Sequence, residues 1–375
     1  MFNAIYQPKL TLDSLAPLFS EWCATTPEAG VFVLLPEAEK EQVSMLQSVA
    51  RAYNLPMLGA IFPALLTSEG FQQSGAILLQ LDPCPPWILV GQLGDNKNVA
   101  GVEQIAAFVK SHSPTQVSED KPILFLTFDC LLPNISTILH GLYTKLEHEV
   151  SYVGVNAGSE SFQPMPCLFD HNQCIEQGGI AMLLGSETQF AVDHGYPTAK
   201  PVFRATSSVG NRIDKINDRP ALEIYQQLVK QEFGIDITSE NFYQYAVHYP
   251  LGLTTVLDVL VRIPVGLTEE GGIYCVGEIP TNSMLKLLLA PRLEESHCIE
   301  SLTESLGRSD KPLLTFYCAG RRMHFGESAE AELRHLQESC NAPDILGALT
   351  LGEIGTDLEM GYPEFHNAAL VCARP

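Results

Sequence analysis

Hydrophobic and polar positions along the chain repeat one pattern three times. In each copy an apolar run typical of a buried strand is followed by an amphipathic stretch, and then by a second apolar run with a small residue beside glycine near its start. The first runs are GVFVLLPE (30–37), KPILFLTFDC (121–130) and KPLLTFYCAGRR (311–322). The second runs are LPMLGAIFPALL (55–66), VSYVGVNAGSES (150–161) and PDILGALTLGEIG (343–355). The pattern predicts three strand–helix–strand units.

A third apolar run follows each copy. These runs are GAILLQL (75–81), GGIAMLLG (178–185) and FHNAALVCA (365–373). Trailing strands of this kind, together with the alternating run 201–209 that is typical of a hairpin, favour mixed sheets over purely parallel ones. We therefore expect an α+β (mixed α/β) fold in which helices cover mixed β-sheets.

The expected division of the chain follows from its length and from a change in character. A chain of 375 residues is long for a single core, so two domains are the natural expectation. After residue 185 the repeat gives way to loop signals and alternating runs. We place a boundary near residue 195 and expect domains over 1–195 and 196–375, built from related units.

Composition narrows the classes of partner. The formal net charge of -22 disfavours nucleic acid and anionic membrane surfaces, which attract basic proteins. No apolar stretch approaches the roughly 18 to 20 residues of a membrane span, and the N-terminus lacks the features of a secretory signal. The ten cysteines form no C-x-x-C pair, and several lie inside apolar runs, as in a reducing compartment. We expect a cytoplasmic protein.

Motifs of catalysis are absent from the sequence. It contains no G-x-S-x-G, H-E-x-x-H, P-loop or dinucleotide-binding fingerprint, so we expect no enzymatic activity. One alternative is an enzyme that uses a cysteine nucleophile. Cys318 is the candidate, because Arg321 and Arg322 lie close to it in sequence and a nearby cation lowers a thiol pKa.

Two glycine-bearing corners are stronger candidates for binding. The segments 153–161 and 349–357 each follow a predicted strand, and glycine lets a ligand approach the backbone. The candidate ligand-binding residues are Asn156, Gly158, Ser159, Arg321 and Glu353. A tight turn explains the glycines equally well, and Glu353 can alternatively pair with Arg321 or Arg322.

Three further residues are candidates because of their positions. His194 lies in DHGYP (193–197), beside the expected domain boundary, where pockets are common. His366 precedes the last predicted strand, and Cys167 follows a proline. A lone histidine is more often a structural hydrogen-bonding group than a ligand of a metal.

Several motifs resemble the FIST-domain family. In the C-terminal half these motifs are YPLGL, VRIP, GGIYCVGEIP, LTFYCAGRR, GALTLGEIG and FHNAAL, in that order, and DHGYP resembles the start of the same region. VGVNAGSESFQPMPCLFD and GGIAMLLG resemble the FIST N-terminal region. The resemblance covers about residues 28–373. The segment LGAIFPALLTSEG (58–70) departs from the cysteine-and-threonine turn that the family usually has there.

The resemblance implies a sensory module that binds a small ligand and signals to a separate protein. The MPCLFD element (165–170) is similar to that of stand-alone members that bind haem, sense nitric oxide and regulate a histidine kinase. On this reading His194 is the first candidate for the haem iron, followed by His366 and Cys167. The alternative is a small metabolite such as an amino acid, bound without haem at the glycine corners. Unpaired strand edges make a homodimer unsurprising.

We further expect the ligand to contact the second and third units, near residues 193–197, and not the first.

Overall fold

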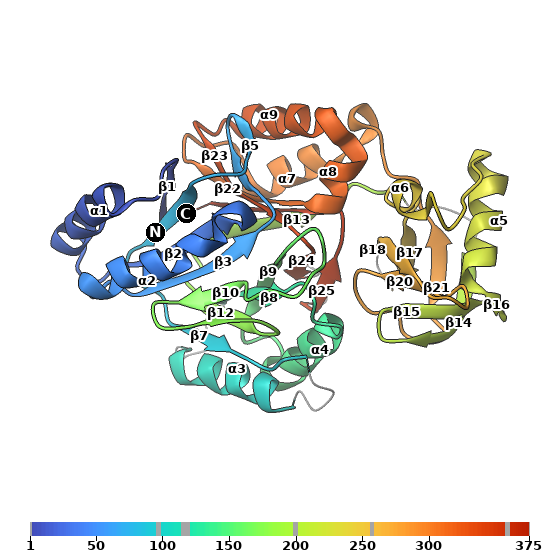
Figure 1. Cartoon of the computed structure of the whole chain (residues 1–375), viewed down its shortest axis with the longest axis horizontal. Coiled ribbons are helices and arrows are strands. Elements are labelled where there is room, and N and C mark those ends of the chain that lie inside the picture. Colours follow the sequence, from blue (N-terminus) through green and yellow to red (C-terminus); the bar gives the residue numbers. More distant parts are fainter. Residues whose placement is uncertain are drawn as a thin grey trace.

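The computed structural model describes residues 2–94, 99–113, 121–197, 202–255, 259–356 and 361–374. They form a large body and a smaller lobe (Figure 1). The body comprises the described residues before 198 and after 290, and the lobe comprises those from 202 to 290. In Figure 1 the lobe is the yellow and orange group at the right, beside the body.

The body contains three six-stranded mixed sheets, one centred on each predicted unit. The first unit consists of β1 (Phe2–Gln7), α1 (Leu12–Thr25), β2 (Gly30–Pro36), α2 (Val43–Ala52), β3 (Met57–Phe62), β4 (Leu65–Thr67), β5 (Gly70–Gln72) and β6 (Ala76–Leu81). The second consists of β7 (Trp87–Val90), α3 (Val99–His112), β8 (Ile123–Asp129), α4 (Ile135–Leu146), β9 (Ser151–Ala157), β10 (Leu168–Asp170), β11 (Cys174–Ile175) and β12 (Gly179–Leu184).

The third unit begins before the lobe and is completed after it. It consists of β13 (Gln189–Asp193), α7 (Cys298–Leu306), β22 (Leu313–Cys318), α8 (Ala319–Phe325), α9 (Ala329–Cys340), β23 (Ile345–Thr350), β24 (Glu353–Thr356), β25 (Pro363–His366) and β26 (Leu370–Arg374). Short 3-10 helices cover Glu37–Gln42, Leu293–Glu295 and Gly326–Ser328. The predicted α+β fold of mixed sheets covered by helices is confirmed.

Each unit pairs its strands in the same way. Its two long strands are parallel (β2 with β3, β8 with β9, β22 with β23), and its last strand lies antiparallel beside the first of them. The hairpin between them joins a different unit. Thus β4 pairs with β23, β10 with β3, and β24 with β9. The exchange links the three sheets in a closed cycle and pairs strands from both sides of residue 195.

A glycine in the second long strand explains the small residue in each repeated motif. Each of these glycines faces a residue of the parallel neighbour strand, and an added Cβ would lie within 2.7 Å of that residue's carbonyl oxygen. The glycines and their partners are Gly59 with Val33, Gly154 with Leu126 and Gly347 with Thr315. Only glycine permits this close approach of two backbones.

The lobe is inserted between β13 and α7 and has its own sheet. Its elements are β14 (Val202–Val209), β15 (Arg212–Ile216), β16 (Arg219–Pro220), α5 (Ala221–Phe233), α6 (Phe242–Ala246), β17 (Leu251–Thr254), β18 (Val259–Arg262), β19 (Pro264–Leu267), β20 (Ile273–Cys275) and β21 (Met284–Leu287). The predicted hairpin is confirmed as β14–β15, and α5 packs its buried face over this sheet.

Within the described residues, no helix combines the length and the apolar character that crossing a membrane requires.

Candidate ligand-binding site

A cavity of about 310 Å³ lies between the lobe and the body, and we call it the seam pocket. The body contributes residues from the segment after β9, from α8 and from the turns that flank β24 and β26. The lobe contributes α6 and the strand β19 with its neighbours. The lining residues are Glu160, Phe162, Tyr243, Val247, Ile263, Pro264, Val265, Val276, Cys318, Ala319, Gly320, Met323, Leu351, Gly352 and Asn367.

The two predicted glycine corners meet at the body wall of this pocket. Because β24 pairs with β9, Glu353 lies opposite Val155. The Asn156 N–H donates to the Gly352 carbonyl at 2.8 Å, and the Leu351 N–H donates to the Asn156 carbonyl at 3.1 Å. Two segments far apart in sequence therefore form one corner, and Leu351 and Gly352 line the pocket.

Asn156 has an unused side-chain amide. The residue is 0% exposed, and neither its Nδ2 nor its Oδ1 has a hydrogen-bond partner among the described residues. Gly352 separates it from the pocket, and a Cβ on Gly352 would lie 3.1 Å from Nδ2. Leaving a buried amide unpaired costs about 1–3 kcal/mol, so such a group in a native protein calls for an explanation. A ligand or water that reaches past Gly352 supplies one.

Of the other corner residues, Gly158 and Ser159 have local roles. Gly158 has φ of 137°, a conformation that favours glycine. The Ser159 hydroxyl is hydrogen-bonded to the Ser161 hydroxyl at 2.8 Å. Neither residue lines the seam pocket, although Glu160 directly after them does.

Glu353 is buried behind the pocket wall. It is 0% exposed and accepts hydrogen bonds from Thr350 Oγ1 at 2.6 Å and from the Ala369 N–H at 3.3 Å. Burial raises its pKa to about 7, although these bonds and the Cys318 thiol oppose the shift. The alternative that Glu353 pairs with Arg321 or Arg322 is wrong, because these two arginines contact Glu332 and Glu160 instead.

The Cys318 thiol lines the seam pocket but has the wrong electrostatics for a nucleophile. Burial and the neighbouring Glu353 carboxylate raise its pKa, whereas a reactive thiolate needs a lowered one. Its sulfur accepts a hydrogen bond from the Ala368 N–H at 3.1 Å. The Arg321 backbone lowers the thiol pKa slightly, but the Arg321 guanidinium is bound to Glu332 and to the His194 carbonyl instead.

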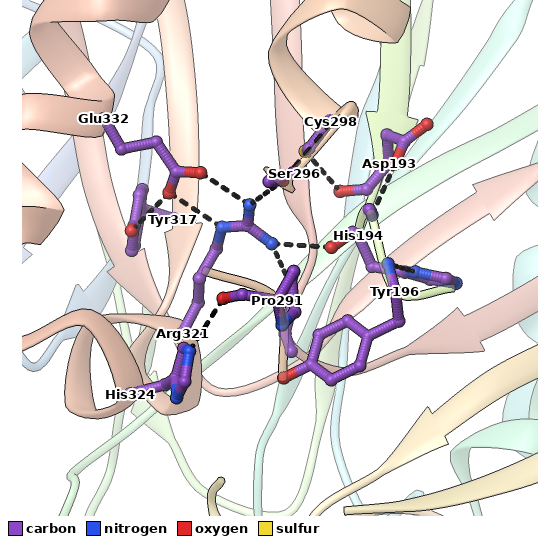
Figure 2. Close-up of polar contacts among 12 residues, drawn as sticks. Asp193, His194, Tyr196, Pro291, Ser296, Cys298, Tyr317, Arg321, His324 and Glu332 are labelled. Atoms are coloured by element: carbon purple, nitrogen blue, oxygen red, sulfur yellow. Dashed lines mark hydrogen bonds and ion pairs between the residues drawn. The ribbon is translucent and has the colours of Figure 1, made fainter. Parts of the chain in front are cut away.

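Arg321 is the centre of a buried network at the junction of body and lobe (Figure 2). Its guanidinium forms a two-pronged ion pair with Glu332, at 2.8 Å from Nε and 2.6 Å from Nη2. Nη1 donates to the carbonyls of His194 and Ala368 at 2.7 and 3.0 Å. The Tyr317 hydroxyl donates to Glu332 at 2.6 Å. Arg321 is 1% exposed and does not line the pocket, so the structure gives it a positioning role.

The residue predicted first for haem, His194, does not fit that group in this conformation. His194 Nε2 lies 3.0 Å from the Val259 carbonyl and must carry the proton, while Nδ1 accepts from the Tyr196 N–H at 2.9 Å. Both nitrogens are thus engaged, and an axial ligand needs a free lone pair. The ring centroids of His194 and His366 lie 6.3 Å apart. Nδ1 of His366 has no hydrogen-bond partner among the described residues.

Burial and the nearby His194 and Arg262 lower the pKa of His366 to about 3, so its imidazole is neutral. Cys167 is buried in the core that includes Phe169 of β10, and burial raises its thiol pKa. None of these three candidates lines the seam pocket. In the part of the chain that the structure describes, no group of three or more histidine, cysteine, aspartate or glutamate side chains is arranged to hold a metal. Haem binding stays a prediction.

The sequence analysis missed the lobe side of the pocket. It also missed Glu160 on the body side, which is the one charged residue among the described residues that line the pocket. Glu160 adjoins the predicted corner, and that proximity is the only signal for it in the sequence. Tyr243 lies on α6 and Val247 directly follows it, and the sequence carries no motif of binding there. Among the described residues, none of the first unit lines the seam pocket.

Two protein-family models match most of the chain. Residues 30–219 match the FIST N domain, and residues 221–356 match the FIST C domain. The chain therefore belongs to the FIST family. FIST domains are sensory domains for small ligands in signalling, and this defines the class of the protein. No curated protein matches the chain.

Proposed function

We propose that the protein senses a small ligand in the seam pocket and that the bound ligand changes how the lobe sits on the body. A separate signalling protein, such as a histidine kinase, reads this change. One observation carries the proposal: lobe and body each supply part of the pocket wall. A ligand that touches both parts binds one arrangement more tightly than another, and this difference is what shifts a conformational equilibrium.

The direct polar contacts across the seam suit such a shift. They include the Ile263 N–H to Asn367 Oδ1 at 3.1 Å, Arg262 Nη1 to the Phe365 carbonyl at 2.9 Å, and the Thr137 N–H to Glu278 at 3.0 Å. Thr137 also donates its hydroxyl to Glu278 at 2.5 Å, and the other two contacts are single hydrogen bonds. One hydrogen bond is worth about 1 kcal/mol, or somewhat more when charged. A ligand of moderate affinity is therefore strong enough to rearrange them.

Blocking the pocket tests the proposal. A Cβ on Gly320 would lie 2.3 Å from Ile263 Cδ1 across the seam, so Gly320→Leu fills the cavity. Gly266→Leu is the matched control, since a Cβ there meets only Tyr274 at 3.8 Å and lies outside the pocket. Small molecules that stabilise the wild type in a thermal-shift screen should lose their effect with Gly320→Leu and keep it with Gly266→Leu. Hits that Gly320→Leu leaves unchanged would contradict the proposal.

Haem-based sensing of nitric oxide is the more specific version of this function. The resemblance of residues 165–170 to the haem-binding FIST proteins supports it. The hydrogen bonds of His194 do not support it, because they occupy both ring nitrogens. Absorption spectra of the protein titrated with haem test it. A Soret band that shifts on binding and is altered in His194→Ala would support it, and an unshifted band would leave the ligand of the seam pocket as the signal.

A further inference from the structure

The wall of the seam pocket defines the chemistry of its ligand. Glu160 is the only charged residue among the described residues that line it, and no lysine, arginine or histidine is present there. Phe162 and Tyr243 add two aromatic rings, and most of the remaining lining is apolar. A ligand that matches this wall has an apolar body and a positive charge.

The Glu160 carboxylate is available to such a ligand. Within the described residues no hydrogen bond reaches it, and its closest cation, Arg322 Nη1, lies 3.9 Å away, beyond hydrogen-bond distance. The Arg322 guanidinium is stacked over Phe71, at 4.6 Å from the ring centroid, and is thereby held toward the first unit. The Glu160 side chain is 43% exposed, and partial burial raises its pKa, although the charge of Arg322 opposes the shift. A half-buried carboxylate whose ion pair is loose and lacks a hydrogen bond gains from a closer cation.

The aromatic rings add a second source of attraction for a cation. Tyr243 lies close enough to Glu160 for the carboxylate charge to contribute to the raised pKa of its hydroxyl. Its hydroxyl is 3.8 Å from the sulfur of Met323, another pocket residue. Ammonium groups bind over aromatic faces with about 0.5–2 kcal/mol, more when water is excluded. A carboxylate beside aromatic rings is therefore a site for an ammonium group.

We propose that the seam pocket binds an organic amine, with its ammonium group beside Glu160 and its apolar part against α6, β19 and α8. This inference rests on the proposed function, since it names the ligand class of the same pocket. A free amino acid fits less well, because none of the described lining residues offers a cation to its carboxylate. The cavity volume of about 310 Å³ suits a compact amine, at the lower end of the roughly 300–1,000 Å³ of small-molecule sites.

Three matched probes test the ligand class: phenethylamine, 2-phenylethanol and 3-phenylpropionate, which share an apolar part and differ in charge. Isothermal titration should show the amine binding at least about tenfold more tightly than the alcohol. The carboxylate should bind most weakly. Glu160→Gln should lower the affinity for the amine to that for the alcohol. Glu232 is an exposed residue of the lobe, and Glu232→Gln should leave the affinities for the amine and for the alcohol unchanged.

The outcomes separate the two proposals. Equal binding of amine and alcohol, blocked by Gly320→Leu, overturns the amine inference and leaves the pocket intact as a ligand site. Amine binding that persists in Gly320→Leu counts against the seam pocket itself. Absence of amine binding to the wild type overturns the inference. Thermal unfolding of Glu160→Gln and Glu232→Gln checks that both variants fold like the wild type.

Discussion

In the body, every sheet contains a hairpin from another unit, whereas the lobe builds its sheet from its own strands alone. The body sheets cannot form one by one, because β3, β9 and β23 each need a partner from elsewhere in the chain. One core cluster of the lobe lies entirely between Phe203 and Leu287, whereas a smaller cluster joins lobe residues to the body; its members are Val259, Val261, Ile263, Leu288 and Ala290 of the lobe and Tyr196 and Ala368 of the body. The difference indicates one cooperative body and a lobe that has its own core and a smaller apolar contact with the body, with the ligand pocket beside that contact.

The two buried guanidinium groups beside the seam are held differently, whereas Arg374 of β26, elsewhere in the body, donates to the carbonyl oxygens of Leu306, Gly307 and Cys340. Arg321 in the body has the carboxylate of Glu332 as its partner. Arg262, at the lobe edge, donates to the carbonyl oxygens of Val261, Phe365 and Glu278, and burial lowers its pKa to about 10. The body wall of the pocket is thus fixed by an ion pair, and the described contacts of Arg262 at the seam are to neutral acceptors.

The largest effect is expected from breaking the body network. Glu332→Ala leaves Arg321 buried without its carboxylate and should destabilise the body by about 3–5 kcal/mol. Both tryptophans, Trp22 and Trp87, lie in the body, so urea unfolding followed by tryptophan fluorescence reports this part. Glu103→Ala removes the exposed pair with Lys145 and should cost under about 1 kcal/mol. Equal costs in the two variants would contradict the role of the network.

The next largest effect isolates the lobe. Leu285 is fully buried in the lobe core, so Leu285→Ala should cost about 2–5 kcal/mol through the cavity it leaves. Amide hydrogen exchange should speed up across α5 and β14, while the tryptophan-detected transition stays where it was. Met284→Ala, at the exposed neighbouring residue, is the control. A shift of the tryptophan transition with Leu285→Ala would show that lobe and body unfold together.

The sequence could predict the repeated units because each reflects local packing. The strand period, the amphipathic helix and the glycine at 59, 154 and 347 all lie within one unit. The exchange of hairpins could not be predicted, because an apolar run indicates a strand and not the sheet edge that it joins. For the same reason the sequence marks the two glycine corners, 153–161 and 349–357, but not their contact. Glu353 pairs with Val155, and Asn156 forms backbone hydrogen bonds with Leu351 and Gly352.

The site residues show the same limit. Arg321 was predicted to bind a ligand, but its partner Glu332 lies 11 residues later on α9, and only the packing of that helix brings the two together. His194 was predicted as an iron ligand, but the lobe carbonyl of Val259 binds its Nε2. Both contacts depend on where a helix or an inserted lobe packs, and hydrophobic periodicity carries no information about that.

A smaller effect tests the body wall of the pocket through pH. The pKa of Glu353 is about 7 in the folded state, whereas its ordinary value, taken for the unfolded state, is 4.5. Between these two pH values the folded state binds more protons than the unfolded state, so the free energy of unfolding rises as the pH falls. At pH 8, above this pKa, the Glu353 carboxyl is mostly ionised and the buried charge opposes folding. Glu353→Gln should therefore be more stable than the wild type at pH 8, by about 1–3 kcal/mol, and similar to it at pH 5.

Urea unfolding at both pH values, followed by tryptophan fluorescence, checks this expectation. The exposed Glu103→Gln is the control and should change stability equally little at pH 5 and pH 8. A Glu353→Gln variant that is less stable than the wild type at pH 8 would mean that the carboxylate, and not the neutral acid, is what the fold needs.

The smallest effect concerns a histidine pair that joins lobe and body. His324 of α8 donates through Nε2 to the Pro291 carbonyl at 2.9 Å, so its Nδ1 accepts from Nδ1 of His248 at 2.7 Å. Burial lowers the pKa of both imidazoles from 6.5, and their contribution is therefore lost as the pH falls below that value. His324→Ala should weaken lobe docking by about 1 kcal/mol at neutral pH.

The pH dependence distinguishes this pair from ordinary packing. Protonation of Nδ1 of His324 would place its proton against the proton that His248 donates, so acid should break the pair in the wild type. The His324→Ala variant has no such pair and should not lose stability in this way. Lobe exchange in wild type and His324→Ala should then differ at pH 7.5 and converge at pH 5, and His335→Ala, at an exposed position on α9, should follow the wild type throughout. A difference that is the same at both pH values would show that His324 holds the lobe by packing alone and not through its hydrogen bond with His248.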